Sequence, residues 1–84
     1  MPERVLYHSS WCPFCRAFLP HFRDMVPGGR EVLLDDPQDP LWNELRLYYV
    51  PTVIEYEGGK EMRRLMARPM VGLRRKDLEA WILG

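Results

Sequence analysis

The fold is decided by one stretch near the N-terminus, Arg4-Val5-Leu6-Tyr7-His8-Ser9-Ser10-Trp11-Cys12-Pro13-Phe14-Cys15. Its first five residues, Arg4–His8, predict a short buried strand, and the residues after Ser9 predict a loop that leads into a helix. Pro13 suits the first helical turn because its missing N–H is not needed there, and Ser10 is a candidate cap for the helix. The cysteines therefore lie at a strand-to-helix junction.

The two cysteines have different predicted environments at this junction. Cys12 is expected at the helix N-cap or one residue before the first turn, where free backbone N–H groups and the helix dipole stabilise a thiolate. Cys15 lies one helical turn further on and is expected to be more buried, with a higher pKa, within disulfide reach of Cys12. Such a pair can divide the work of thiol–disulfide exchange, in which one thiol attacks and the other resolves. Arg16 is a candidate modulating residue that could add positive potential, or it could simply be solvated.

Two other interpretations of the cysteine pair are open. A purely structural disulfide would close a loop of only four residues, which gains little stability. A metal site could combine Cys12 and Cys15 with His8 and His21, because two nitrogen and two sulfur ligands suit structural zinc. A CxxC motif placed between a strand and an amphipathic helix favours a catalytic redox pair over both.

Hydrophobic spacing and turn residues predict the rest of the chain. In the short second helix Leu41 and Leu45 are expected to face inward, with Tyr48 as a further candidate. The predicted order β-α-β-α-β-β-α indicates an α/β fold with a four-stranded mixed sheet and three helices, in which the first two strands are parallel and the last two form a hairpin. The predicted elements are strands at Arg4–His8, Glu31–Asp35, Pro51–Tyr56 and Glu61 to about Arg68, a hairpin turn at Glu57–Lys60, and helices from Pro13 to about Met25 (with Pro20 inside), at Leu41–Leu47, and from Leu73 or Arg74 to Leu83.

Composition limits the classes of function. The chain has 84 residues, which predicts a single domain over residues 1–84. Its hydrophobic content of 46% is that of a globular protein and not of a disordered one. A net charge of zero removes any global attraction to nucleic acids or acidic membranes. We find neither an apolar run of about 18 residues nor a signal-peptide pattern, so we expect a cytoplasmic protein, and we expect it to be monomeric.

The stretch Tyr7–Cys15 resembles the active site of the thioredoxin/glutaredoxin superfamily, and the resemblance covers almost the whole chain. Glutaredoxins usually have Pro-Tyr between the cysteines, where this chain has Pro13-Phe14. Trp11 before Cys12, Pro20 within the helix, and the segment from Val71 into the last helix are similar to thioredoxins. The resemblance implies a minimal thioredoxin fold of glutaredoxin size.

Val50-Pro51-Thr52 resembles the second diagnostic element of both families. The resemblance implies a cis peptide bond before Pro51, packing of Pro51 against the sulfurs, and a Val50 backbone that hydrogen-bonds an extended substrate. The substrate-binding residues that the resemblance implies are Trp11, Pro13, Phe14, Val50, Pro51 and Gly72.

Three departures from the family patterns concern the substrate and the proton. Ser9 stands where glutaredoxins commonly carry a lysine that contacts a glutathione carboxylate. The segment after Gly72 lacks their second glycine and close aspartate, although Arg74 and Arg75 could bind a carboxylate or form a solvated basic face. Leu6 occupies the position of the buried aspartate that accepts the proton of the resolving thiol in thioredoxins.

The resemblance implies a thiol–disulfide oxidoreductase in which Cys12 is the nucleophile and Cys15 resolves the mixed disulfide. The expected substrates are protein disulfides, the expected redox group is the Cys12–Cys15 disulfide itself with no bound cofactor, and the expected electron source is a thioredoxin-reductase-type flavoprotein or glutathione. Two alternatives stay open. One is a metal or iron–sulfur binding module, and the other is a non-catalytic adaptor that docks partners on an apolar rim of Trp11, Phe14 and Val50.

Overall fold

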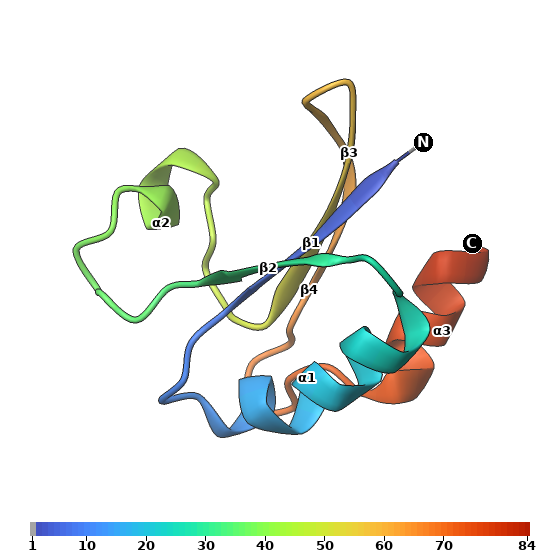
Figure 1. Cartoon of the computed structure of the whole chain (residues 1–84). Helices are drawn as coiled ribbons and strands as arrows, with labels where there is room; N and C mark the ends of the chain where they lie inside the picture. The colour runs from blue at the N-terminus through green and yellow to red at the C-terminus, as the bar shows by residue number, and fades with distance from the viewer. Residues whose placement is uncertain (1) are drawn as a thin grey trace.

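The four strands form one mixed sheet in the order β2-β1-β3-β4, with helices on both of its faces (Figure 1). β1 pairs in parallel with β2 and antiparallel with β3, and β3 and β4 form an antiparallel hairpin. This is the fold class that the sequence predicts. The computed structural model describes residues 2–84, and its elements are β1 (Glu3–His8), α1 (Pro13–Met25), β2 (Arg30–Leu33), α2 (Leu41–Glu44), β3 (Thr52–Glu57), β4 (Lys60–Met66) and α3 (Arg75–Leu83).

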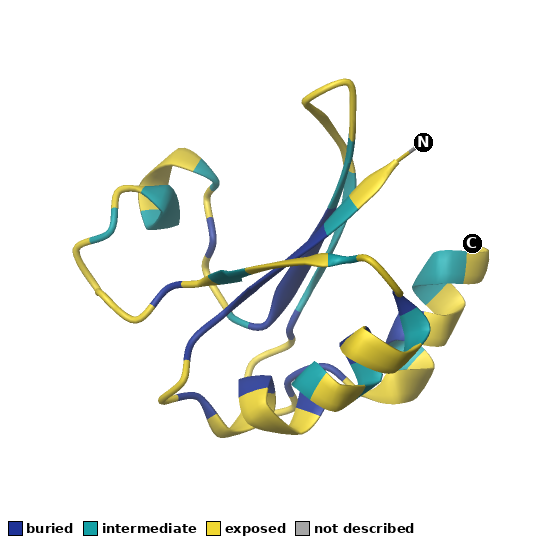
Figure 2. Cartoon of the chain, viewed as in Figure 1, coloured by how far each residue is buried: buried dark blue, intermediate teal, exposed yellow. Residues whose placement is uncertain are grey.

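The two central strands, β1 and β3, divide the core between the two faces of the sheet. Successive side chains of a strand point to opposite faces. In β1, Leu6 therefore joins the cluster under α1 and α3, whereas Val5 and Tyr7 join the cluster on the α2 side. In β3, Val53 and Ile54 divide in the same way. Figure 2 shows that the buried residues are concentrated in these central strands and on the inner sides of the helices.

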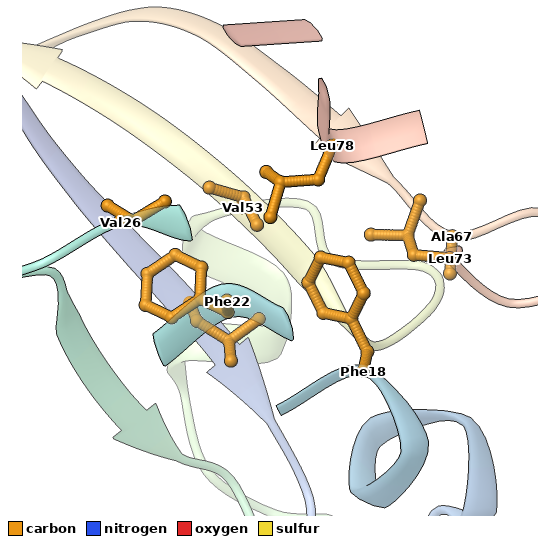
Figure 3. Close-up of a cluster of buried hydrophobic side chains, with 8 residues drawn as sticks. Phe18, Phe22, Val26, Val53, Ala67, Leu73 and Leu78 are labelled. Atoms are coloured by element: carbon orange, nitrogen blue, oxygen red, sulfur yellow. The ribbon is translucent and has the colours of Figure 1, made fainter. Parts of the chain in front are cut away.

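The larger cluster fixes α1 and α3 on one face of the sheet. Phe18 and Phe22 of α1 point toward Leu78 of α3 and Val53 of β3 (Figure 3). The two phenylalanines lie one helical turn apart, so both fall on the same side of α1. Because α1 begins directly after Cys12, this packing also fixes the position of the cysteine pair relative to the sheet.

Helix α2 is shorter than predicted, because a Schellman motif ends it. Arg46 has a positive φ of 52°, its N–H donates to the Asn43 carbonyl at 3.2 Å, and the Leu47 N–H donates to the Trp42 carbonyl at 2.9 Å. The position with positive φ is usually a glycine, so an arginine there gives no sequence signal for the end of the helix. Tyr48 consequently lies outside the helix and is 72% exposed, which makes the prediction of an inward Tyr48 wrong.

Three other boundaries shift by a few residues. β2 ends at Leu33, and the buried Leu34 follows it outside the strand. β4 ends at Met66, and the chain beyond it forms an isolated bridge between Arg68 and Gly72. α3 begins at Arg75, where the Asp77 carboxylate accepts the N–H of Arg74 at 2.9 Å and so caps the first turn. Among the helices of residues 2–84, none has the length and apolarity needed to cross a membrane.

Leu78→Ala tests the packing of α3 on the sheet. Leu78 is fully buried, so its truncation should lower the free energy of unfolding by about 2–5 kcal/mol in urea denaturation. Leu83→Ala is the matched control on the same helix, because Leu83 is 88% exposed and its truncation should change that free energy by less than about 0.5 kcal/mol. Equal losses from the two variants would contradict the packing described here.

Candidate redox site

The loop between β1 and α1 is tied to the chain that follows β2. The buried Ser9 donates its hydroxyl to the Leu34 carbonyl at 2.6 Å. Ser10 donates its N–H and its hydroxyl to the Asp35 carboxylate at 2.8 and 2.7 Å. The bonds from the Ser10 hydroxyl and amide lower the pKa of Asp35 below its usual value. Ser10 is therefore not the helix cap that the sequence suggested, and its side chain instead holds the loop in place.

Cys12 is the N-cap of α1. Its backbone is extended, with φ −95° and ψ 115°, and its Sγ accepts the N–H of Cys15 at 3.3 Å. Pro13 occupies the first helical position, as predicted. A sulfur that replaces the usual oxygen cap lies at the helix end where unpaired N–H groups and the macrodipole stabilise negative charge. The side chain of Cys12 is thus placed where a thiolate is chemically favoured.

Cys15 lies one turn further on, in a more enclosed environment. Its side chain is 1% exposed, compared with 6% for Cys12, and both are free thiols. Burial, together with the neighbouring Cys12, raises the pKa of the Cys15 thiol to about 12. The folded protein thus holds this proton more tightly than the unfolded chain, so its stability falls as pH rises from about 9 toward about 12. Cys15 is thus the more buried of the two cysteines, as predicted, and the pKa of its thiol is raised, as predicted.

The segment before β3 forms the second wall of the site. The Val50–Pro51 peptide bond is cis, as the resemblance implied. The Cys12 Sγ lies 3.7 Å from the Val50 carbonyl oxygen, so a thiol there can donate to it. The buried Thr52 donates its hydroxyl to the Tyr49 carbonyl at 2.7 Å, and the Pro51 carbonyl accepts the Ala67 N–H at 3.1 Å. These bonds fix the backbone that faces Cys12.

Gly72 borders the site on another side, where it lies directly against Phe14, one of the two residues between the cysteines. It has a φ of +73°, and a Cβ added to it would lie 2.7 Å from Cδ1 of Phe14. Only a glycine meets both requirements, because other residues are strained at this φ and would displace the Phe14 ring. The chain after β4 therefore touches the CxxC motif through a contact between a glycine and an aromatic ring.

Apolar side chains surround the site. Trp11 and Phe14 are 59% and 42% exposed, and Val50 is partly exposed, in agreement with the predicted rim. The structure adds Tyr49, which sequence reasoning missed. Its carbonyl accepts the Thr52 hydroxyl at 2.7 Å, and the residue is 45% exposed. Its adjacency to Val50 in the chain is the signal that could have revealed it.

The remaining predicted residues do not join the cysteines in one cluster. His8 is buried, and burial lowers its pKa. His21 instead lies at the surface, with its Nδ1 3.5 Å from the Arg75 guanidinium. Within residues 2–84, no group of three or more histidine, cysteine and acidic side chains could hold a metal ion. Arg16 is exposed on α1 and stays a predicted modulating residue.

Comparison with solved structures identifies the fold. A thioredoxin from Malassezia sympodialis matches with a TM-score of 0.74 at 20% identity, over 98% of this chain and 72% of that one. A thioredoxin from Fasciola hepatica gives 0.70 at 21% identity, over 98% and 78%. Thioredoxin f2, solved in a complex with ferredoxin:thioredoxin reductase, gives 0.74 at 23% identity, over 98% and 74%. No protein-family model and no curated protein matches the sequence. The chain has the thioredoxin fold.

The enclosed environment of Cys15 predicts a distinctive pH dependence of its reactivity. Burial holds the pKa of this thiol well above its usual value, so very little reactive thiolate is present at pH 8. In the Cys12→Ser variant, burial still acts on Cys15, so its alkylation by iodoacetamide should be slow and rise about tenfold per pH unit from pH 8 to 10. The same variant unfolded in urea is the control, and its rate should level off near the ordinary thiol pKa. A folded-state rate that levels off below pH 9 would argue against this environment.

Gly72→Ala tests the contact with Phe14. The new methyl group must displace the ring and also strains the backbone, so the free energy of unfolding should fall by about 1–3 kcal/mol. Gly58→Ala is the matched control, because Gly58 also has a positive φ, of 60°, but no atom lies within 4 Å of its added Cβ. The loss should be larger at Gly72, and adding Phe14→Ala should recover part of it. Identical losses at the two glycines would show that the ring contact contributes nothing.

Proposed function

We propose that this protein is a thiol–disulfide oxidoreductase that exchanges the Cys12–Cys15 dithiol with protein disulfides. The observation that carries the proposal is the position of the Cys12 sulfur. It caps α1, accepts the Cys15 N–H at 3.3 Å, and lies 3.7 Å from the Val50 carbonyl beside the cis-proline. A nucleophilic sulfur, a resolving thiol one turn away, and a backbone edge for the substrate are the three parts that exchange requires.

The reaction would proceed in two displacements. The Cys12 thiolate attacks one sulfur of a substrate disulfide, so that a mixed disulfide forms and the other substrate sulfur leaves as a thiolate. The sulfur of Cys15 then attacks the Cys12 sulfur, so that the Cys12–Cys15 disulfide forms and the second substrate thiol is released. Two electrons pass to the substrate, and an external reductant must return them to the protein.

The proton of Cys15 has to leave before the second displacement. Leu6, which is fully buried, stands where the resemblance to thioredoxins implies an aspartate that would accept this proton. Since burial is the largest cause of the raised pKa of Cys15, we infer that the substrate thiolate expelled in the first displacement is the base that accepts this proton. That thiolate is released at the site, and with an ordinary pKa of about 8.5 it is a stronger base than a carboxylate. It is a weaker base than the Cys15 thiolate, so the transfer is uphill and is drawn forward by formation of the Cys12–Cys15 disulfide.

The surroundings of the site favour a reductase as electron source over glutathione. Ser9, at the position where a lysine would meet a glutathione carboxylate, is buried with its hydroxyl on the Leu34 carbonyl. Arg74 and Arg75, the other candidates for that role, are paired with Asp77 and Asp24. Thioredoxin f2, which has the same fold, is known in complex with a reductase. We therefore propose regeneration by a thioredoxin-reductase-type flavoprotein in a reducing cytoplasm.

Reduction of insulin disulfides in the presence of dithiothreitol tests the function. The wild-type protein should accelerate insulin precipitation, and Cys12→Ser should not exceed the rate with dithiothreitol alone. In a separate incubation with insulin and without dithiothreitol, the reduced Cys15→Ser variant should accumulate a mixed disulfide with the substrate, visible by mass spectrometry, because no resolving thiol is present. Wild-type activity no higher than that of Cys12→Ser would refute the proposal.

The exposed rim of Trp11 and Phe14 favours a non-catalytic adaptor as the second candidate. Its mark would be partner binding that is unaffected when both cysteines are replaced by serine.

Parallel assays of the oxidised protein with thioredoxin reductase and NADPH, and with glutathione, would identify the electron source.

A further inference from the structure

The peptide unit that joins His8 to Ser9, at the end of β1, is held by the main chain of Leu34. The Leu34 N–H donates to the His8 carbonyl at 2.7 Å, and the buried Ser9 hydroxyl donates to the Leu34 carbonyl at 2.6 Å. The ladder between β1 and β3 ends at Tyr7 and Thr52. The Ser9 N–H therefore lies just past the end of this ladder and is available to another partner.

The N–H of this peptide unit faces the resolving cysteine. In a trans peptide unit the carbonyl and the N–H point in opposite directions. The carbonyl points toward Leu34, so the N–H points away from it, and the sulfur of Cys15 accepts this N–H. Burial and the neighbouring Cys12 raise the pKa of the Cys15 thiol, whereas the Ser9 N–H lowers it. Among these influences, the Ser9 N–H is the one that favours the thiolate.

A donor to the Cys15 sulfur matters because the resolving step needs this sulfur as a thiolate. Cys15 and Ser9 are 1% and 0% exposed, so water has little access to either. In such surroundings a fixed N–H stabilises a charged acceptor more strongly than a neutral one. The Ser9 carbonyl in addition accepts the Cys12 N–H at 3.4 Å, so the main chain of one residue contacts both cysteines.

We propose that Ser9 is a positioning residue for the resolving step, because its hydroxyl, bonded to Leu34, keeps the Ser9 N–H aimed at the sulfur of Cys15 while that sulfur carries negative charge. The inference rests on the proposed function. Serine suits this position, since an apolar side chain would leave the Leu34 carbonyl without its donor and the peptide unit held only through the His8 carbonyl. The hydroxyl thus acts on the thiolate through the backbone and touches no reacting atom.

Alkylation of Cys15 tests this role without any substrate. In the Cys12→Ser background, Ser9→Ala should lower the rate of reaction with iodoacetamide about threefold or more between pH 8 and 10, because a less well-placed N–H stabilises the thiolate less. Ser10→Ala is the matched control, since the Ser10 hydroxyl bonds to Asp35 in the same loop, and its rate should stay within about twofold. An unchanged or faster rate in Ser9→Ala, or an equal loss in Ser10→Ala, would overturn the proposal.

The two displacements can be separated with one equivalent of a small aromatic disulfide whose released thiolate is coloured. Attack by Cys12 releases the first thiolate, and attack by Cys15 on the mixed disulfide releases the second. Ser9→Ala should leave the first phase within about twofold and slow the second about threefold or more. Equal slowing of both phases would overturn the role in resolution while leaving the proposed function intact. A wild-type protein that releases no thiolate would refute the proposed function, and the role of Ser9 in resolution with it.

The hydrogen bond itself can be observed without changing Ser9. Cys15→Ala removes the acceptor, so the Ser9 amide proton should move upfield in the NMR spectrum and exchange with solvent about tenfold faster or more. The Ser10 amide, which donates to Asp35, should keep its position. A Ser9 amide that Cys15→Ala does not affect would overturn the proposal, even if Ser9→Ala does not fold. Thermal unfolding of each variant checks that the fold is kept.

Discussion

The cap of α1 is the interaction on which the functional face depends. A helix begins with N–H groups that have no partner within the helix, and a side-chain oxygen usually accepts one of them. Here the acceptor is the Sγ of Cys12, which bonds to the Cys15 N–H at 3.3 Å. A thiol is a weak acceptor and a thiolate a strong one. The start of the helix and the chemistry of the nucleophile therefore reinforce each other, and the same contact sets the spacing between the two cysteines.

Three loops from distant parts of the chain complete the site, and each is fixed through main-chain atoms. The Leu34 carbonyl accepts the Ser9 hydroxyl, the Pro51 carbonyl accepts the Ala67 N–H, and the Gly72 N–H donates to the Arg68 carbonyl. A domain of this size has little core with which to hold long loops. Short loops that bond to one another next to the ends of the strands need little core, because the sheet itself positions them.

The sequence predicted most of the fold and the centre of the site, for identifiable reasons. The bounds of α1 and the roles of Cys12 and Pro13 follow from a strong apolar periodicity and a proline at the first helical position. The cis bond before Pro51 came only from the family resemblance, because most X–Pro bonds are trans. The start of α1 and the burial of the cysteines could therefore be predicted from the residues around them. The cis bond could not be predicted in this way.

The errors fall where a residue adopts a conformation that its type does not indicate. Arg46 has a positive φ at the end of α2. A glycine at this position would have marked the end of the helix. The hydroxyl of Ser10 also gave no sign that it would bond to Asp35, which lies 25 residues away in the chain, instead of to the next helix. Such tertiary partners are chosen by the assembled sheet and not by neighbouring residues.

The site contains a thiol that is shielded from water and apolar side chains that are exposed to it, and different elements of the fold carry the two. Cys15 is enclosed, and burial is the main cause of its raised pKa. Trp11 and Phe14 of the rim are exposed to solvent. The enclosed thiol lies on α1, which packs on the sheet through Phe18 and Phe22, whereas the rim lies at the start of that helix and on the adjoining loops. Because different elements carry the enclosed thiol and the exposed rim, the rim residues can vary with little change to the packing that encloses Cys15.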